Sequence, residues 1–208
     1  KMKNICFYDV DTQKDFMDKT GALYVPNAEE IKSLLAVLTE YASANRIQVM
    51  GSVDRHYATD EEMKIFPPHC MDSTEGQKKI PETCAGNKAF IENKAYSANE
   101  LKVKMSAQTV YFEKQGVDVF SNANANLLTR FDAAVVYGVA TEYCVKAAVL
   151  GMRKRGIDVL VVEDAIKGIT PEGEAAAIKE MKAAGARFIK TGHVRYGNIE
   201  QILKEMWS

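Results

Sequence analysis

The stretch AAVVYGVATEYCVKAAVLGMRKRG, residues 133–156, changes its periodicity halfway along. Residues 133–140 are apolar almost throughout and rich in valine, which is typical of a strand that is covered on both faces. From Thr141 the apolar residues recur every three or four positions, as on one face of a helix, and Gly156 ends the pattern. Because a buried strand followed directly by a helix is the repeating unit of parallel sheets, this stretch predicts an α/β fold.

Similar strand patterns recur along the whole chain. Short runs of β-branched or aromatic residues predict five more strands, at residues 5–11, 46–54, 109–114, 157–165 and 187–191. Helical patterns alternate with them, and right-handed crossovers then place helices on both faces of the sheet. We therefore expect a three-layer α/β/α sandwich with a central, mostly parallel six-stranded sheet.

The helices are predicted from their apolar periodicity and from residues that start or stop a helix. Asn27 and Asn198 each precede a helical pattern and have a Glu or Gln three positions later, the spacing of a capping box. Pro171 after Thr170 predicts the start of another helix, and Gly185 predicts its end.

The composition excludes several classes of protein. The chain has 208 residues, 47% hydrophobic and 26% charged, as in an ordinary globular protein, and residues 1–208 are expected to form a single domain. A net charge of -1 without a cluster of Lys and Arg argues against nucleic acid as a partner. No apolar run is long enough to span a bilayer, and four cysteines do not suggest a disulfide scaffold, so we expect a cytoplasmic protein whose natural start is Met2.

Polar residues stand at or just past the carboxyl ends of five predicted strands: Asp11, Asp54, Lys114, Cys144 and Asp164. In open α/β sheets, ligands bind beyond these ends. An acid, a lysine and a cysteine at one edge have the form of a catalytic site. Taken singly, each of these residues also has an ordinary explanation, as a residue of a turn or as a solvated side chain.

Cys144 has the most specific local chemistry. If Thr141 caps the helix, Cys144 is its third residue, where free N–H groups and the helix dipole favour a thiolate. The same N–H groups could bind an oxyanion. Asp11 is then a candidate base, and Lys114 would add positive charge. The alternative is that Cys144 is a small buried hydrophobe between helix and sheet.

A second group of candidates lies in VDRHYATDEEMKIFPPHC, residues 53–70, at the start of a long irregular stretch. Asp54 and His56 leave a strand end on the same side because they are two positions apart. His69 could join them, with Glu61 or Glu62 in between. Mixed nitrogen and oxygen ligands suit Zn, Fe or Mn, so the stretch predicts a divalent-metal site.

The combination of DTQKDF (11–16), DRH…PPHC, the strand-end lysine and GVATEYCV (138–145) resembles the isochorismatase-like cysteine hydrolases. The metal motif most resembles the nicotinamidase branch of that family. The resemblance runs from Asp9 to about Ile169 and implies a single isochorismatase-like hydrolase domain. It also implies the family's parallel-sheet sandwich, in agreement with the periodicity.

The resemblance implies roles for matching positions. Asp11 would be the acid/base, Lys114 the triad lysine and Cys144 the nucleophile. A cis peptide at Val139–Ala140 would direct the N–H groups of Ala140 and Cys144 at the oxyanion. The remaining implied site residues are the metal ligands Asp54, His56, Glu62 and His69 and the ring-binding residues Phe16 and Phe66.

The implied activity is hydrolysis of nicotinamide to nicotinate and ammonia through a thioester, with a metal that orients the pyridine ring. Zinc is the preferred metal, with iron and manganese as alternatives, and a homo-oligomer is expected. A ureido, carbamoyl or other small amide is the alternative substrate. Lys94 is an alternative to Lys114, which is preferred because it ends a strand. The segment after Lys114 also departs from the family's usual serine-aromatic sequence.

Overall fold

The computed structural model describes residues 3–208, so the expected start at Met2 lies outside the described residues. Seven strands form one parallel sheet in the order β3-β4-β2-β1-β5-β6-β7. The strands are β1 (Ile5–Val10), β2 (Val49–Asp54), β3 (Lys88–Ile91), β4 (Thr109–Lys114), β5 (Ala133–Val139), β6 (Asp158–Lys167) and β7 (Arg187–Ile189). All six predicted runs form strands, and the parallel α/β sandwich is confirmed.

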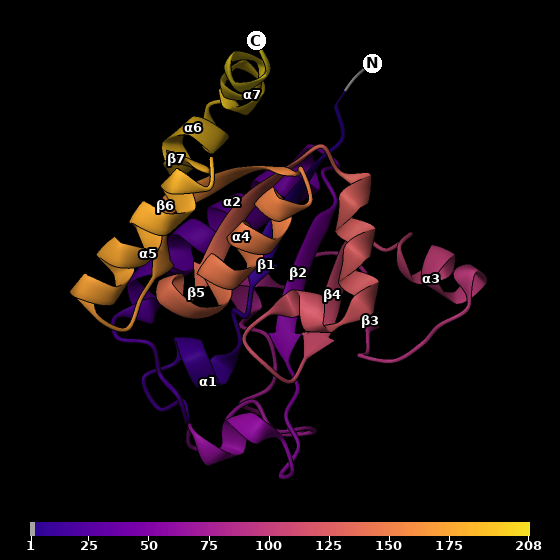
Figure 1. The fold of residues 1–208 in the computed structure, drawn as a ribbon, viewed down its shortest axis with the longest axis vertical. Coiled ribbons are helices and arrows are strands. Elements are labelled where there is room, and N and C mark those ends of the chain that lie inside the picture. The colour runs from indigo at the N-terminus through magenta and orange to yellow at the C-terminus, as the bar shows by residue number, and fades with distance from the viewer. Residues whose placement is uncertain (1–2) are drawn as a thin grey trace.

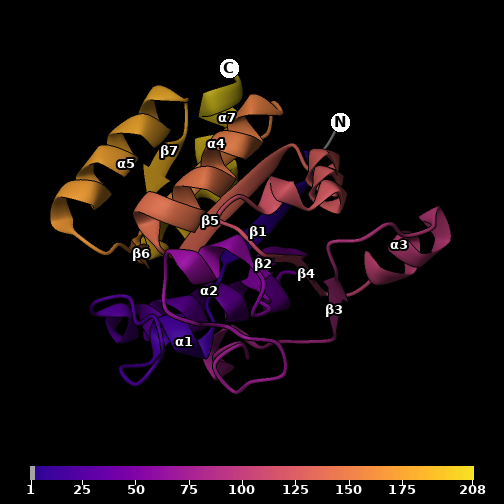
Figure 2. The same cartoon turned by 60° about the horizontal axis from the view of Figure 1, so that its bottom comes forward.

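The number of strands is the one correction to the fold. The seventh strand, β3, lies at the edge of the sheet within the stretch that sequence periodicity left irregular. It has four residues, and only Ile91 is buried. A strand this short and this exposed lacks the apolar run that identifies a central strand. The helix that follows it, α3 (Ala98–Lys104), protrudes from the body of the molecule beyond β3 (Figures 1 and 2).

Helices cover both faces of the sheet (Figure 1). One face packs against α4 (Lys146–Lys154), α5 (Pro171–Ala183) and the 3₁₀ helix η5 (Ala123–Arg130). The other packs against α2 (Lys32–Ala44), α6 (Thr191–Arg195), α7 (Ile199–Trp207) and the short α1 (Lys14–Met17). Both faces of the central strands are therefore buried, as their apolar sequences predict.

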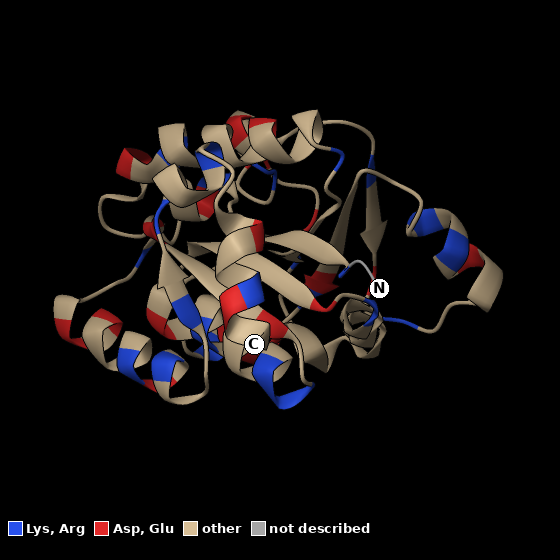
Figure 3. Ribbon diagram, turned by 90° about the horizontal axis from the view of Figure 1, so that it is seen from above, with Lys and Arg blue, Asp and Glu red and all other residues tan. Residues whose placement is uncertain are grey.

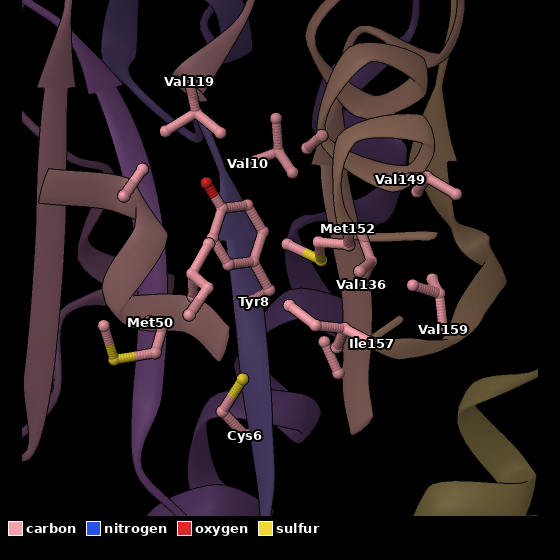
Figure 4. Close-up of a cluster of buried hydrophobic side chains, with 14 of the residues drawn as sticks. Cys6, Tyr8, Val10, Met50, Val119, Val136, Val149, Met152, Ile157 and Val159 are labelled. Carbon is pink, nitrogen blue, oxygen red and sulfur yellow. The ribbon is translucent and has the colours of Figure 1, made fainter. Parts of the chain in front are cut away.

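The hydrophobic core around β1 shows the two-residue period of a strand. Cys6, Tyr8 and Val10 project from the same face of β1, between Met50 of β2 and Met152 of α4 (Figure 4). All five side chains are fully buried. The alternation places the neighbouring residues of β1 on the opposite face, which belongs to the second cluster.

The predicted helix starts at Asn27, Pro171 and Asn198 are confirmed, whereas the capping boxes predicted at Asn27 and Asn198 are not formed. Thr170 accepts the Gly173 N–H at 3.0 Å, Pro171 opens α5, and Gly185 follows its end with a φ of +93°. Asn27 has a φ of +61° and makes no capping bond, since capping requires an extended residue. Asn198 is itself in helical conformation and makes none either.

Charged residues of both signs alternate along the helices, as the net charge of -1 suggests (Figure 3). Within residues 3–208, none of the helices combines the length and the apolar character that crossing a membrane requires.

Candidate active site

The carboxyl ends of four adjacent strands bring the predicted site residues together. In Figure 1, β1 and β2 point down toward α1 and the long segment that follows β2. Asp11 follows β1, Asp54 ends β2, Lys114 ends β4 and Cys144 lies just past β5. Because these strands are neighbours in the order β4-β2-β1-β5, the side chains converge at one edge. Asp164 lies elsewhere and accepts hydrogen bonds from Thr191.

Lys114 is the centre of the cluster. Its Nζ lies 2.8 Å from Asp11 Oδ2 and 3.3 Å from Cys144 Sγ, and it also contacts Asp54 Oδ1. The Lys114 and Asp11 side chains are buried. Ser52 Oγ donates to the other oxygen of Asp11 at 2.6 Å. Lys114 thus joins the acid and the thiol.

Lys94, the alternative lysine, has a different environment from that of Lys114. The Lys94 side chain is 56% exposed and its Nζ pairs with Glu92 at 3.3 Å. Of the two lysines weighed from the sequence, only Lys114 contacts Cys144.

The protonation of Cys144 differs from the sequence-based expectation. Burial raises the pKa of the thiol well above its usual value, and the nearby Lys114 only partly offsets this. Burial also raises the pKa of Asp11, against the lowering effect of Lys114. The pKa of Lys114 itself is raised, because Asp11 and Asp54 outweigh the desolvation of its charge. The cluster therefore favours a neutral thiol beside an ammonium group in the resting state, rather than a thiolate produced by the helix start.

The turn that carries Cys144 also begins differently from the prediction. Thr141 is the first residue of the π-helical turn η6 (Thr141–Val145), and it makes no capping bond. Ala140 precedes the turn, and its carbonyl accepts the N–H groups of Tyr143 and Val145 at 3.1 and 3.2 Å. Cys144 is therefore the fourth residue of the helical segment, not the third. The expected cis peptide at Val139–Ala140 is present.

Gly138 allows the strand end to approach β1 closely. Its φ is +120°, and a Cβ added there would lie 2.2 Å from the carbonyl oxygen of Val10. Only glycine combines this conformation with this contact. The turn with Cys144 is thereby held against the strand that leads to Asp11.

Four potential metal ligands form a second cluster beside the first. One ligand atom from each of Asp54, His56, Glu62 and His69 lies within 4.8 Å of the others. His56 Nε2 is 3.2 Å from Asp54 Oδ2 and 3.3 Å from Glu62 Oε2. His69 Nε2 is 3.6 and 3.5 Å from the same two oxygens. Two nitrogens and two oxygens in this compact arrangement suit zinc, iron or manganese.

The structure distinguishes the two candidate glutamates. Glu61 has an 83% exposed side chain and pairs with Lys64 at 2.8 Å. Glu62 is 13% exposed and points at the histidines. Both belong to the 3₁₀ helix η2 (Glu61–Lys64), which turns adjacent residues to different sides.

The outer nitrogens of both histidines are bound, which directs their Nε2 atoms into the cluster. His56 Nδ1 pairs with Asp60 at 3.1 Å, and His69 Nδ1 with the Pro67 carbonyl at 2.8 Å. Burial lowers the pKa of both rings, but the surrounding carboxylates, chiefly Asp54, outweigh it and raise the pKa to about 10 for His56 and about 9 for His69. The carboxylates thus favour positive charge at this position.

A cavity of about 140 Å³ connects the two clusters. Its polar lining includes Cys144, Asp54, Glu62 and His69. Phe16 lies 5.5 Å from the His69 ring and Phe66 lies 6.2 Å from it, measured between ring centroids. The rest of the lining is apolar or aromatic: Leu23, Val25, Val117, Val139, Ala140, Tyr143 and Ile169.

The isochorismatase domain profile matches residues 9–192 of the chain. The chain belongs to the isochorismatase family. The nicotinamidase of Escherichia coli strain K12 is 26% identical over 201 residues, which cover 85% of this chain and 90% of that protein. Together with the parallel sheet, this membership makes the chain an isochorismatase-family hydrolase.

Solved structures of the family are similar throughout. The nicotinamidase/pyrazinamidase PncA of Bacillus subtilis has 25% sequence identity and a TM-score of 0.75, covering 91% of this chain and 100% of that chain. The pyrazinamidase of Pyrococcus horikoshii, solved in complex with zinc, has 26% identity and a TM-score of 0.71, covering 90% and 99%.

Tyr143 and Ile169 are among the pocket residues of this isochorismatase-family hydrolase that sequence reasoning missed, together with Leu23, Val25 and Val117. Tyr143 lies next to Cys144, and its ring is 6.1 Å from that of Phe66. Ile169 comes from the segment between β6 and α5. The position of Tyr143 beside the candidate nucleophile was a usable signal, whereas nothing in the sequence indicated that Ile169 reaches the pocket.

Proposed function

We propose that this protein is an amidohydrolase that converts nicotinamide to nicotinate and ammonia. The observation that carries the proposal is the contact of one buried lysine, Lys114, with both Asp11 and Cys144, directly beside the ligand cluster. Relatives named nicotinamidase and pyrazinamidase support the choice of substrate.

The reaction would proceed through a thioester at Cys144. Asp11 takes the thiol proton as the sulfur attacks the carboxamide carbon. The N–H groups of Ala140 and Cys144 stabilise the oxyanion that forms. When the C–N bond breaks, Asp11 returns the proton to the departing amine, and ammonia leaves. Asp11 then takes a proton from water, whose oxygen attacks the thioester. When the C–S bond breaks, Asp11 returns this proton to the sulfur, which restores the thiol, and the nicotinic acid that leaves ionises to nicotinate.

Lys114 would remain protonated throughout this cycle. Its ammonium group lies against Asp11 and Cys144 and stabilises negative charge on either of them. This explains why a thiol whose pKa is raised by burial can still react: its proton moves to Asp11 only as the C–S bond forms.

Asp54, His56, Glu62 and His69 would hold a divalent metal, with zinc preferred and iron or manganese as alternatives. Such an ion, when bound, supplies a Lewis-acid contact for the ring nitrogen and thereby orients the substrate. Phe16 and Phe66 lie beside the same cluster, where they can pack against the two faces of an aromatic ring.

The lining favours nicotinamide over the alternative ureido and carbamoyl substrates that carry a carboxylate. Among residues 3–208, no lysine or arginine lines the cavity. A substrate carboxylate there would have no lysine or arginine of the lining to pair with, which makes its desolvation costly.

An assay of ammonia release tests the substrate directly. We expect kcat/KM for nicotinamide to exceed that for N-carbamoyl amino acids by about 10²-fold or more, because the carboxylate of the latter finds no lysine or arginine partner in the lining. A higher kcat/KM for a carbamoyl compound would reject nicotinamide as the substrate in favour of the alternative.

Replacing Glu62 with glutamine should weaken zinc binding by about 10-fold or more, because a charged ligand becomes a neutral amide. Zinc affinity is measured by competition with a chromophoric chelator. Glu61→Gln is the matched control. It removes the same charge from the preceding residue, whose side chain is 83% exposed, and should leave the affinity for zinc unchanged. Equal losses in both variants would contradict the ligand role of Glu62.

A further inference from the structure

The carboxylate of Glu142, two positions before Cys144, has no role in the chemistry proposed above. It accepts the backbone N–H of Ile169 at 2.7 Å and that of Thr170 at 3.3 Å. These two residues lie in the segment between β6 and α5, far from Glu142 in sequence. One side chain therefore joins the turn that carries the candidate nucleophile to a separate part of the chain.

Two glycines leave room for this carboxylate. A Cβ added to Gly168 would lie 2.4 Å from a carboxylate oxygen of Glu174 and 2.9 and 3.0 Å from the two carboxylate oxygens of Glu142. A Cβ added to Gly173 would lie 2.9 Å from one of them. Side chains at either position would therefore press on Glu142. The absence of a side chain at these two positions thus allows the carboxylate of Glu142 to reach the backbone of this segment.

The contact also lies at the start of α5. Thr170, whose N–H Glu142 accepts, caps that helix by accepting the Gly173 N–H. A carboxylate at this end of a helix interacts favourably with the helix dipole. The segment is thus held from two sides, by its own helix cap and by Glu142.

Ile169 is the residue of this segment that lines the cavity. It lines the cavity together with Tyr143, which directly follows Glu142. Ile169 is also 38% exposed, so its side chain is covered only in part by its neighbours. Its position in the cavity wall depends on where its backbone is fixed.

We propose that Glu142 is a positioning residue that fixes Ile169 as a wall of the substrate pocket, and that it thereby sets the affinity for the substrate ring. The effect on affinity rests on the proposed nicotinamidase function, whereas the fixing of the segment does not. Glu142 does not touch the reacting atoms, so its removal loosens binding more than it slows the chemistry.

The kinetic test compares Glu142→Ala, Ile169→Ala and the double variant. We expect Glu142→Ala to raise KM for nicotinamide about 10-fold, with kcat changed less than about 3-fold. In the Ile169→Ala background the same change should alter KM less than about 2-fold, since the wall it positions is gone. Independent, additive effects would overturn the proposal, as would a loss confined to kcat.

Two further variants separate positioning from general damage. Glu142→Gln retains one oxygen for the Ile169 N–H and should keep most of the affinity. Glu172→Ala removes an exposed carboxylate from the same end of α5 and should leave KM unchanged. An equal rise of KM in Glu172→Ala and Glu142→Ala would show a general effect of charge and overturn the proposal.

Amide hydrogen exchange tests the positioning without any substrate. In Glu142→Ala, the amides of Ile169 and Thr170 should exchange about 10-fold faster or more, while those of β5 keep their rates. Unchanged exchange at both amides would overturn the proposal whatever the substrate is. If the wild type releases no ammonia from nicotinamide, the proposed function fails, and the exchange rates alone decide whether Glu142 fixes this segment.

Discussion

Cys144→Ala should abolish ammonia release from nicotinamide, with a fall in kcat of about 10⁴- to 10⁶-fold. Without the sulfur no thioester can form, and Asp11 and Lys114 have no nucleophile to serve. The variant should still fold, because Cys144 is only partly buried and alanine suits a helical segment. Steady-state ammonia release, together with a thermal melt, measures both expectations.

Cys84→Ala is the matched control for this substitution. Cys84 is an exposed free cysteine and does not line the cavity, so its removal should change neither kcat nor KM. Mass spectrometry of the rapidly quenched wild type adds a direct measurement, since the acyl group should be found on Cys144. Ammonia release that survives in Cys144→Ala would refute the thioester mechanism.

Lys114→Met should have the second largest effect and should act on both catalysis and stability. It removes the cation that contacts Asp11, Asp54 and Cys144 in a buried site. Leaving two buried carboxylates without it should lower the free energy of unfolding by about 3–5 kcal/mol. We expect kcat to fall by at least about 10²–10³-fold, as when a preorganised electrostatic group is removed.

Two companion variants keep this prediction testable if Lys114→Met does not fold. Lys114→Arg retains the charge but not the shape, so it should fold and still lose most activity. Lys94→Met removes a mostly exposed lysine that pairs with Glu92 and lies over the Tyr96 ring, away from Cys144, and should behave as the wild type. Full activity in Lys114→Arg combined with inactivity in Lys94→Met would reverse the assignment of the two lysines.

Sequence periodicity predicted the architecture because the central strands are buried on both faces and so are apolar throughout. The convergence of Asp11, Asp54, Lys114 and Cys144 was predictable for a related reason: each stands at a strand end, and parallel strands end at one edge. The edge strand β3 could not be found in this way, because its exposed residues need not be apolar.

Other properties depend on packing that a linear pattern does not contain. The helix start suggested a lowered pKa for Cys144, but burial raises the pKa of this thiol and the nearby Lys114 offsets the rise only in part. The choice between Glu61 and Glu62 follows from the direction of one 3₁₀ turn. Ile169 lines the pocket and its backbone N–H donates to Glu142, from which it is separated by a helix and a strand.

The two oxygens of Asp54 face different clusters: Oδ2 points at the histidines and Oδ1 contacts Lys114. Because Asp54 belongs to both clusters, its loss would affect both, and this limits which substitutions the chain could accept. A descendant could lose His56, Glu62 and His69 one after another and keep both carboxylate contacts of Lys114. Loss of Asp54 would also remove one of the two carboxylates that contact Lys114, so we expect Asp54 to be retained longest of the four residues.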